Sequence, residues 1–333
     1  MNRLHSLKIL AGLAAMALLT ACTNDDGLTH GEPLSPGKYP LELIAGGLET
    51  VAMPETRSTV DGDWDGVESV AVRVNDSQRS LKYEVKASAD KKTALLTPEA
   101  PLANDDYPFW WTSTTEKKLI TAWYPYSETV PAEWSVPDNQ YQGLPADKDF
   151  LYARKVASFY EHKDGVKMQF YHQLAKVVVN IRNTDFTADR EIVSVTLDGV
   201  HLSGKYTALE EDIEEGKPVQ GSWENTGDKA TITMNRMEAA QDANFGDGAE
   251  PAKASYSALV IPQEAVRQNI QIKIGINGAT YAWSLNNVLA FTHFEGGNQY
   301  TFNIIVRAEG LSVYSYKYPT WEEGDSENIE ITI

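Results

Sequence analysis

The chain has 333 residues, with 47 Asp and Glu against 29 Lys and Arg, so its formal net charge is −18. An acidic surface of this kind repels nucleic-acid phosphates and anionic lipid headgroups, which argues against nucleic-acid binding. The hydrophobic fraction of 42% is sufficient for a folded core. Cys22 is the single cysteine, which excludes an intramolecular disulfide, a thiol redox pair, a zinc finger and an iron–sulfur site.

The N-terminal segment has the features of an export signal. Two basic residues precede an apolar run at 9–19, which is short for a spanning helix of ~20 residues but fits a secretory signal. The run ends in Leu19-Thr20-Ala21-Cys22, which resembles a bacterial lipobox and implies cleavage before Cys22 and lipidation of its thiol. The alternative is an ordinary signal peptide followed by a chance cysteine. We expect 1–21 to be a lipoprotein signal peptide and 23–38 to be a flexible tether.

The rest of the chain contains many short segments with the alternation of apolar residues that is typical of strands. The clearest is 270–276, which has Ile at every second position and is followed by Asn277-Gly278, a hairpin signal. Asp198-Gly199 predicts another turn. The further segments with this pattern are 70–74, 166–170, 177–181, 193–197, 281–285, 300–306 and 329–333.

Helical patterns are scarce, with short candidates only at 146–157 and 237–242. Many short strands separated by Gly, Pro and Asn indicate an all-β protein of the sandwich type. Because the body is large for one sandwich, we expect two consecutive β-sandwich domains with few short helices. The polar stretch at 182–190 suggests a division into 58–183 and 184–333.

Motifs for catalysis are absent from the sequence. There is no HExxH or HxH pair, no GxxxxGK[ST] loop and no G-x-S-x-G elbow, so we expect a protein that is not an enzyme and binds no cofactor. Asp61, Asp63 and Asp65 match the first half of a calcium loop, but Val72 occupies the position where a bidentate Glu is needed. We therefore interpret the three aspartates as a polar turn and expect no metal site.

Aromatic residues are concentrated between 107 and 141. Exposed aromatic rings stack on sugars, so a glycan-binding surface is one interpretation of this cluster. The other is that the rings fill the core of a sandwich and its Pro-rich corners, which is the use we expect. The residues concerned are Trp110, Trp111, Trp123, Tyr124, Tyr126 and Trp134.

Five segments, in one order along the chain, carry a resemblance to a known family. They are Thr56-Arg57-Ser58, the Ala-aromatic-Tyr-Pro-Tyr stretch at 120–126, and the stretches at 149–153, 170–177 and 297–302. Together they resemble the fimbrillins, which are the type V pilins of Bacteroidota. This resemblance implies two transthyretin-like β-sandwiches, export to the outer membrane as a palmitoylated lipoprotein precursor, and assembly by strand exchange.

The resemblance directs attention to two segments. At 39–44, Tyr39, Leu41 and Leu43 alternate, and we expect this strand to fill a groove in the first sandwich. Cleavage between Arg57 and Ser58 would release 22–57 with its lipid and expose a sheet edge, which recruits another strand. The donor would be the tail at 327–333 of another subunit, whose alternating side chains are Ile329, Ile331 and Ile333.

We therefore expect a structural, adhesion-related subunit of a surface fimbria, with other fimbrial subunits as partners. An anchor subunit would keep its lipid and lack the arginine site, and a tip subunit would lack a donor tail. Since this chain has both features, a stalk subunit is favoured. The alternative is a monomeric outer-membrane lipoprotein that binds glycans through the aromatic cluster. The surface ligand is not indicated by the sequence.

Overall fold

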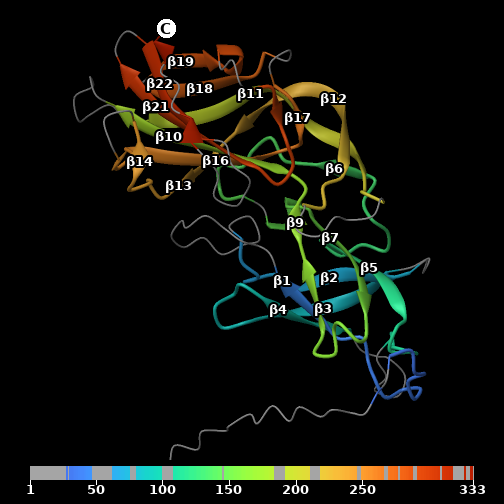
Figure 1. Ribbon diagram of the computed structural model, residues 1–333. Helices are drawn as coiled ribbons and strands as arrows, with labels where there is room; N and C mark the ends of the chain where they lie inside the picture. The colour runs from blue at the N-terminus through green and yellow to red at the C-terminus, as the bar shows by residue number, and fades with distance from the viewer. Residues whose placement is uncertain are drawn as a thin grey trace, which may run out of the picture.

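The computed structural model describes residues 28, 30–46, 62–75, 80–99, 108–144, 146–183, 192–210, 218–245, 249–265, 269–276, 278–287, 291–307, 310–317, 326–327 and 331–332. Over these ranges the chain is nearly all β, as expected, and the helical elements are two 3₁₀ turns, η3 (Ala146–Lys148) and η4 (Leu285–Asn287). None of the helices found there has the length and apolar character needed to cross a bilayer. The strands form two bodies, drawn blue to green and yellow-green to red in Figure 1.

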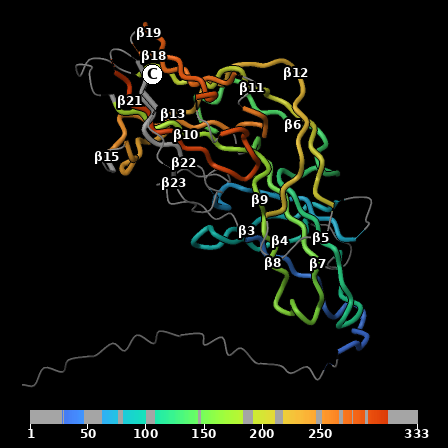
Figure 2. Tube along the Cα trace, turned by 45° about the horizontal axis from the view of Figure 1, so that its top comes forward, coloured from blue at the N-terminus to red at the C-terminus, as the bar shows by residue number. Residues whose placement is uncertain are grey.

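The first body is an eight-stranded sheet that bends round its own core. Its strands, in pairing order, are β8 (Val166–Gln169), β1 (Leu43–Gly46), β4 (Ala94–Pro98), β3 (Leu81–Ala87), β2 (Ser69–Val74), β5 (Lys117–Tyr124), β7 (Leu151–Ser158) and β9 (Tyr171–His172). Six strand spacings of ~4.8 Å would separate β7 from β8 in a flat sheet, which is more than the short link between them spans at ~3.5 Å per residue. The sheet therefore curls, and β7 and β8 lie side by side (Figure 2).

The second body has two sheets that face each other across one large hydrophobic core. The seven-stranded sheet contains β13 (Asn235–Met237), β16 (Ala254–Val260), β10 (Ala175–Asn183), β21 (Gln299–Arg307), β22 (Gly310–Lys317) and β23 (Ser326–Glu327), with β24 (Ile331–Thr332) also on β22. The five-stranded sheet contains β12 (Ser222–Thr233), β11 (Ile192–Thr207), β18 (Gln271–Ile276) and β19 (Ala279–Ser284), with β6 (Glu133–Ser135) also on β11. Two small pairs complete it, β14 (Ala243–Asn244) with β15 (Ala249–Glu250) and β17 (Gln263–Glu264) with β20 (His293–Phe294).

The hairpin predicted at 277–278 is confirmed. Ile276 lies opposite Ala279, which leaves a two-residue turn, and Gly278 has φ +85°, a backbone conformation that glycine adopts without strain. Ile272 faces Trp283 across the two strands, as their alternation predicted.

The turn predicted at Asp198-Gly199 is wrong. Strand β11 continues through it, and the register shift between Asp198 and Val200 with Gly199 at φ +83° marks a bulge instead. A second irregularity, between Ile192 and Ser194, breaks the alternation and leaves Val193 56% exposed. Local sequence does not distinguish a glycine bulge from a turn.

The helical candidates are also wrong. Residues 146–157 form η3 followed by β7, whose pairing with β5 overrides local helix propensity. Residues 237–242 begin at the end of β13 and contain no helix. The division expected at 183–184 lies after β10, although β10 pairs with β16 and β21 in the second body. A central position between two strands explains why β10 carries a continuous apolar run.

Gln173 joins the two bodies through buried hydrogen bonds. Its backbone N–H donates to Phe150 O in the first body, and its side-chain amide donates to Val219 O in the second. Its side-chain oxygen accepts from Tyr206 Oη and from the Gly221 N–H, both at 2.9 Å. These bonds fix the junction at one geometry, since breaking any of them would leave a buried polar group unpaired, at a cost of about 1–3 kcal/mol.

Candidate functional site

Strand β1 belongs to the N-terminal segment that is expected from its sequence to fill a groove in the first sandwich. It lies inside the first sheet, antiparallel to β4 on one side and parallel to β8 on the other. Leu43 is level with Leu96 of β4 and with Val166 of β8. The N-terminal segment therefore completes the sheet at the place where it closes on itself.

The side chains of this segment alternate between core and solvent. Leu41, Leu43 and Ala45 are completely buried, whereas Glu42 between them is exposed. Tyr39 is partly buried and meets Phe159 edge-on, with ring centroids 5.0 Å apart. The strand expected at 39–44 begins later, at Leu43, because Pro40 has no N–H to donate and forms only an isolated bridge.

Upstream of β1 the chain continues along a second edge. Leu41 N donates to Phe109 O at 2.9 Å, and Trp111 N donates to Tyr39 O at 3.0 Å. Further back, Leu34 N donates to Thr112 O and Thr114 N to Glu32 O. The segment 31–46 is thus held along its length by backbone hydrogen bonds, first to 109–114 and then to β4 and β8.

The receiving edge at 109–116 has its own support. Glu116 accepts hydrogen bonds from the backbone and hydroxyl of Thr112 and pairs with Lys118 at 2.6 Å. Burial, the largest single influence, would raise the pKa of Glu116, but the hydrogen bonds from Lys118 and Thr112 outweigh it and lower the pKa. The carboxylate therefore supports this turn from within the edge, in addition to the hydrogen bonds that the turn makes with the N-terminal segment.

Removal of 31–46 would expose both apolar surface and backbone groups. The buried leucines Leu34, Leu41 and Leu43 each contribute about 1.5–3 kcal/mol through burial. Backbone groups of Phe109, Trp111 and the facing sides of β4 and β8 would lose their partners. A groove with these properties binds an extended strand that has apolar side chains at alternate positions.

The expected donor tail pairs within its own chain. Strand β24 is antiparallel to β22, with Ile331 opposite Val313 and Thr332 opposite Ser312, and β23 pairs with the same strand. Ile329 and Ile333 lie outside the described residues. The tail thus occupies the outer side of β22, at the end of its sheet.

Several expected positions are not part of a described site. Cys22, Arg57, Ser58 and Asp61 lie outside the described residues. Asp63 accepts a hydrogen bond from the Asp65 N–H, and Asp65 pairs with Lys91 at 2.8 Å. Asp63 therefore stabilises the turn to Asp65, and Asp65 ties that turn to Lys91. His172 is buried against the equally buried Asp149, 3.0 Å away, so it is a hydrogen-bonded core histidine.

The aromatic cluster is divided between the two cores. Trp111 is buried in the first core, whereas Trp123 is buried in the second and donates from Nε1 to Ser127 Oγ. Trp134 is partly buried, stacks on Phe150 with centroids 5.2 Å apart and donates to Lys148 O. Burial also raises the pKa of Tyr124 to about 12. These rings serve packing, so they do not form one exposed surface for sugars.

Known proteins of similar sequence or fold match most of the length of this chain. A sequence profile of the family described as fimbrillin-like matches residues 56–327. A proposed fimbrium subunit of Bacteroides uniformis, Fim1C, is 23% identical over 325 residues, which cover 95% of each protein. A crystal structure of a proposed cell adhesion protein from Bacteroides uniformis, 17% identical, has a TM-score of 0.57 and covers 86% of this chain and 100% of its own. Another from Bacteroides ovatus, 14% identical, has a TM-score of 0.55 and covers 86% and 99%. At these identities the two crystal structures establish the fold alone.

Proposed function

Because the chain belongs to the fimbrillin-like family, we propose that it is a stalk-type structural subunit of a surface fimbria, without catalytic activity. It is exported as a lipoprotein anchored through Cys22, cleaved between Arg57 and Ser58, and polymerised by strand exchange with other fimbrial subunits. The outer membrane holds the precursor, and the fimbrium holds the mature subunit. The two bodies are consecutive transthyretin-like sandwiches, as the family resemblance implies.

The position of β1 carries the proposal. The strand is built into the first sheet between β4 and β8, yet in sequence it lies before Arg57. Cleavage after Arg57 would leave β1 attached to the body by non-covalent contacts alone. Its departure would open a groove with unpaired edges on both sides, which is the acceptor that strand exchange needs.

The tail supports the other half of the mechanism. Its isoleucines at 329, 331 and 333 have the same spacing of two as the buried Leu41, Leu43 and Ala45 of the resident segment. The tail pairs with the outer side of β22, so it can be released without breaking the interior of a sheet. A contact from the tail of one subunit to the first body of the next does not close on itself, and it therefore produces a filament.

Arg57→Ala is expected to prevent polymerisation because β1 stays covalently attached and keeps the groove occupied. The assay is an unboiled SDS gel after treatment with an arginine-specific protease, on which wild-type protein gives a ladder and the variant stays monomeric. Ser58→Ala is the matched control and should still give the ladder. A ladder from Arg57→Ala would refute the proposal.

Cys22→Ala is expected to abolish incorporation of a palmitate analogue during growth, because the thiol is the acyl acceptor in a lipobox. The unlipidated precursor should accumulate and be missing from the outer-membrane fraction. Equal labelling of the wild type and the variant would contradict lipidation at Cys22.

A further inference from the structure

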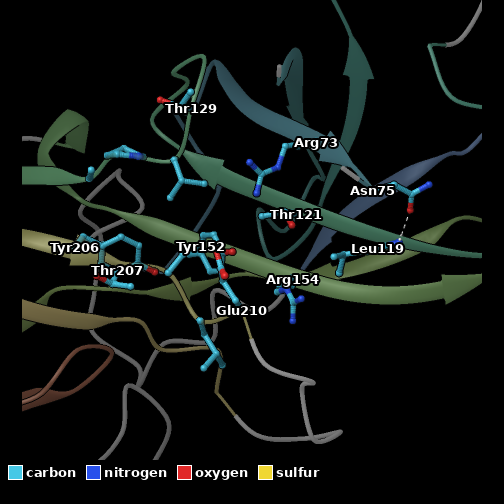
Figure 3. A pocket seen from close by; sticks show the side chains of 15 residues that line it. Arg73, Asn75, Leu119, Thr121, Thr129, Tyr152, Arg154, Tyr206, Thr207 and Glu210 are labelled. Atoms are coloured by element: carbon cyan, nitrogen blue, oxygen red, sulfur yellow. Dashed lines mark hydrogen bonds between the residues drawn. The ribbon is translucent and has the colours of Figure 1, made fainter. Parts of the chain in front are cut away.

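A cleft of about 630 Å³ lies where the two bodies meet, and Figure 3 shows side chains that line it. Its floor comes from β2, β5 and β7 of the first body, and one wall comes from the residues that follow Tyr206 at the end of β11. Pockets of this size bind small molecules, and the junction of two domains is a common place for them.

The register of the strands places two arginines on the floor. Arg73 of β2 and Arg154 of β7 are both level with Thr121 of the central strand β5. The next row on the same face, Ala71, Trp123 and Tyr152, is buried in the second core. The arginine row is therefore the first row that emerges from under the second body, and Figure 3 shows the two guanidinium groups on either side of Thr121.

The floor is held in place by neighbouring aromatic residues. The guanidinium of Arg73 lies 5.8 Å from the centroid of the Trp123 ring. The Thr121 hydroxyl and the Tyr152 phenol share a hydrogen bond, while burial, the main influence, raises the pKa of Tyr152 and keeps that phenol neutral. Two strand spacings, ~10 Å, separate the backbones of the two arginines, a gap that both long side chains can bridge towards one ligand.

The walls are apolar and tied together. Val130 and Pro131 line one side, and Leu209 lines the other. Tyr206 N donates to Ala132 O at 2.9 Å, which joins the two wall segments, and Tyr206 Oη is fixed by Gln173. The cleft is therefore preformed by the same contacts that hold the two bodies together.

Among the described residues, the charge of the cleft lining contrasts with that of the whole protein. In a chain of net charge −18, two guanidiniums share one concave floor, and Glu210 is exposed at the rim. A guanidinium offers five N–H donors in a planar fork, and a planar carboxylate accepts two of them at once. The ionised carboxylate of Glu210 can accept hydrogen bonds from hydroxyl groups of a ligand.

From this arrangement we infer that the cleft binds a carboxylate-bearing sugar residue, of the uronic or sialic acid class. The carboxylate lies between Arg73 and Arg154, the ring packs on the apolar walls, and ring hydroxyls reach Glu210. A simple inorganic anion would use the arginines and leave the walls and Glu210 without a role. This binding is independent of strand exchange, because neither β1 nor the tail lines the cleft.

Titration calorimetry on the full-length protein tests the inference with sialyllactose, a glucuronate-containing hyaluronan tetrasaccharide and neutral lactose. Saturable binding of at least one acidic sugar and none of lactose is expected. Arg73→Gln and Arg154→Gln should each weaken that binding by at least tenfold, and the double variant should abolish it. Lys229→Gln, an exposed change on β12 outside the cleft, should leave the affinity unchanged.

Near-UV circular dichroism checks that each variant is folded. If Arg73→Gln does not fold, the affinity of Arg154→Gln decides the outcome. The inference is overturned if neither acidic sugar binds, if lactose binds equally well, or if the folded arginine variants bind like the wild type. Binding of an acidic peptide in the absence of sugar binding would also overturn it, since the cleft would then serve a protein partner.

Discussion

Serine at positions 329, 331 and 333 in place of the three isoleucines is expected to abolish polymers and leave a folded, secreted monomer. Each buried isoleucine contributes about 1.5–3 kcal/mol, so the three together supply several kcal/mol to the exchanged contact. Because every 1.4 kcal/mol is a tenfold change in affinity, losing them weakens the contact by more than a thousandfold. The subunit itself should remain folded, because the described part of the tail pairs with the outer side of β22, at the end of its sheet.

The other face of the tail provides the control. Glu330→Gln with Thr332→Ser changes the alternate side chains and keeps the isoleucines, so polymers should form normally. Size-exclusion chromatography after arginine-specific cleavage compares the two variants. Polymers from the triple serine variant would exclude the tail as donor, and its unfolding would assign the isoleucines to the core of their own subunit.

Leu43→Ala is expected to lower the free energy of unfolding of the uncleaved precursor by about 2–5 kcal/mol. The side chain is completely buried between β4 and β8, and truncating a buried leucine loses both its burial and its packing. Urea denaturation followed by tryptophan fluorescence detects this change, because Trp64 and Trp111 are buried in the same core as Leu43.

Glu42→Ala is the matched control for Leu43→Ala. Its side chain is exposed, while its backbone oxygen, which accepts from Val166 N, is unaffected by the substitution. A change within about 0.5 kcal/mol is expected. If Leu43→Ala were as mild as Glu42→Ala, β1 would not fill a groove in the precursor, and its removal could not create one.

Local sequence predicts those parts of the fold that depend on side-chain alternation and turn residues. The isoleucines of β18 and the Asn277-Gly278 turn predicted a hairpin, and the alternation of Leu41 and Leu43 predicted the buried face of the N-terminal segment. The turn at Asp198-Gly199 failed because a glycine with positive φ serves a bulge as well as a turn. The division at 183–184 stays a prediction, and the strand that ends there, β10, is placed by pairing with β16 and β21, which lie far away in sequence.

The candidate site could be predicted from the sequence only in part. Period-two patterns at both ends of the chain indicated strands, but the insertion of β1 between β4 and β8 depends on how the sheet curls. Pro40 delayed the start of the strand, which its missing N–H could have indicated. The arginine row of the cleft was not accessible from sequence, since Arg73, Thr121 and Arg154 meet only through strand register.

Disulfide trapping tests strand exchange most directly. Leu95 faces outward on β4 opposite Ile44, so Leu95→Cys marks the edge of the groove. Glu330→Cys or Thr332→Cys marks the positions of the tail that alternate in sequence with the isoleucines. In a background with Cys22→Ala and after cleavage at Arg57, Leu95→Cys combined with one of the tail cysteines should give a covalent ladder of subunits on a non-reducing gel. Ser312→Cys with Thr332→Cys, which are paired within one chain, should cross-link the uncleaved precursor internally and lose that bond on polymerisation. A tail that stays cross-linked to Ser312→Cys, with no ladder through Leu95→Cys, would contradict strand exchange.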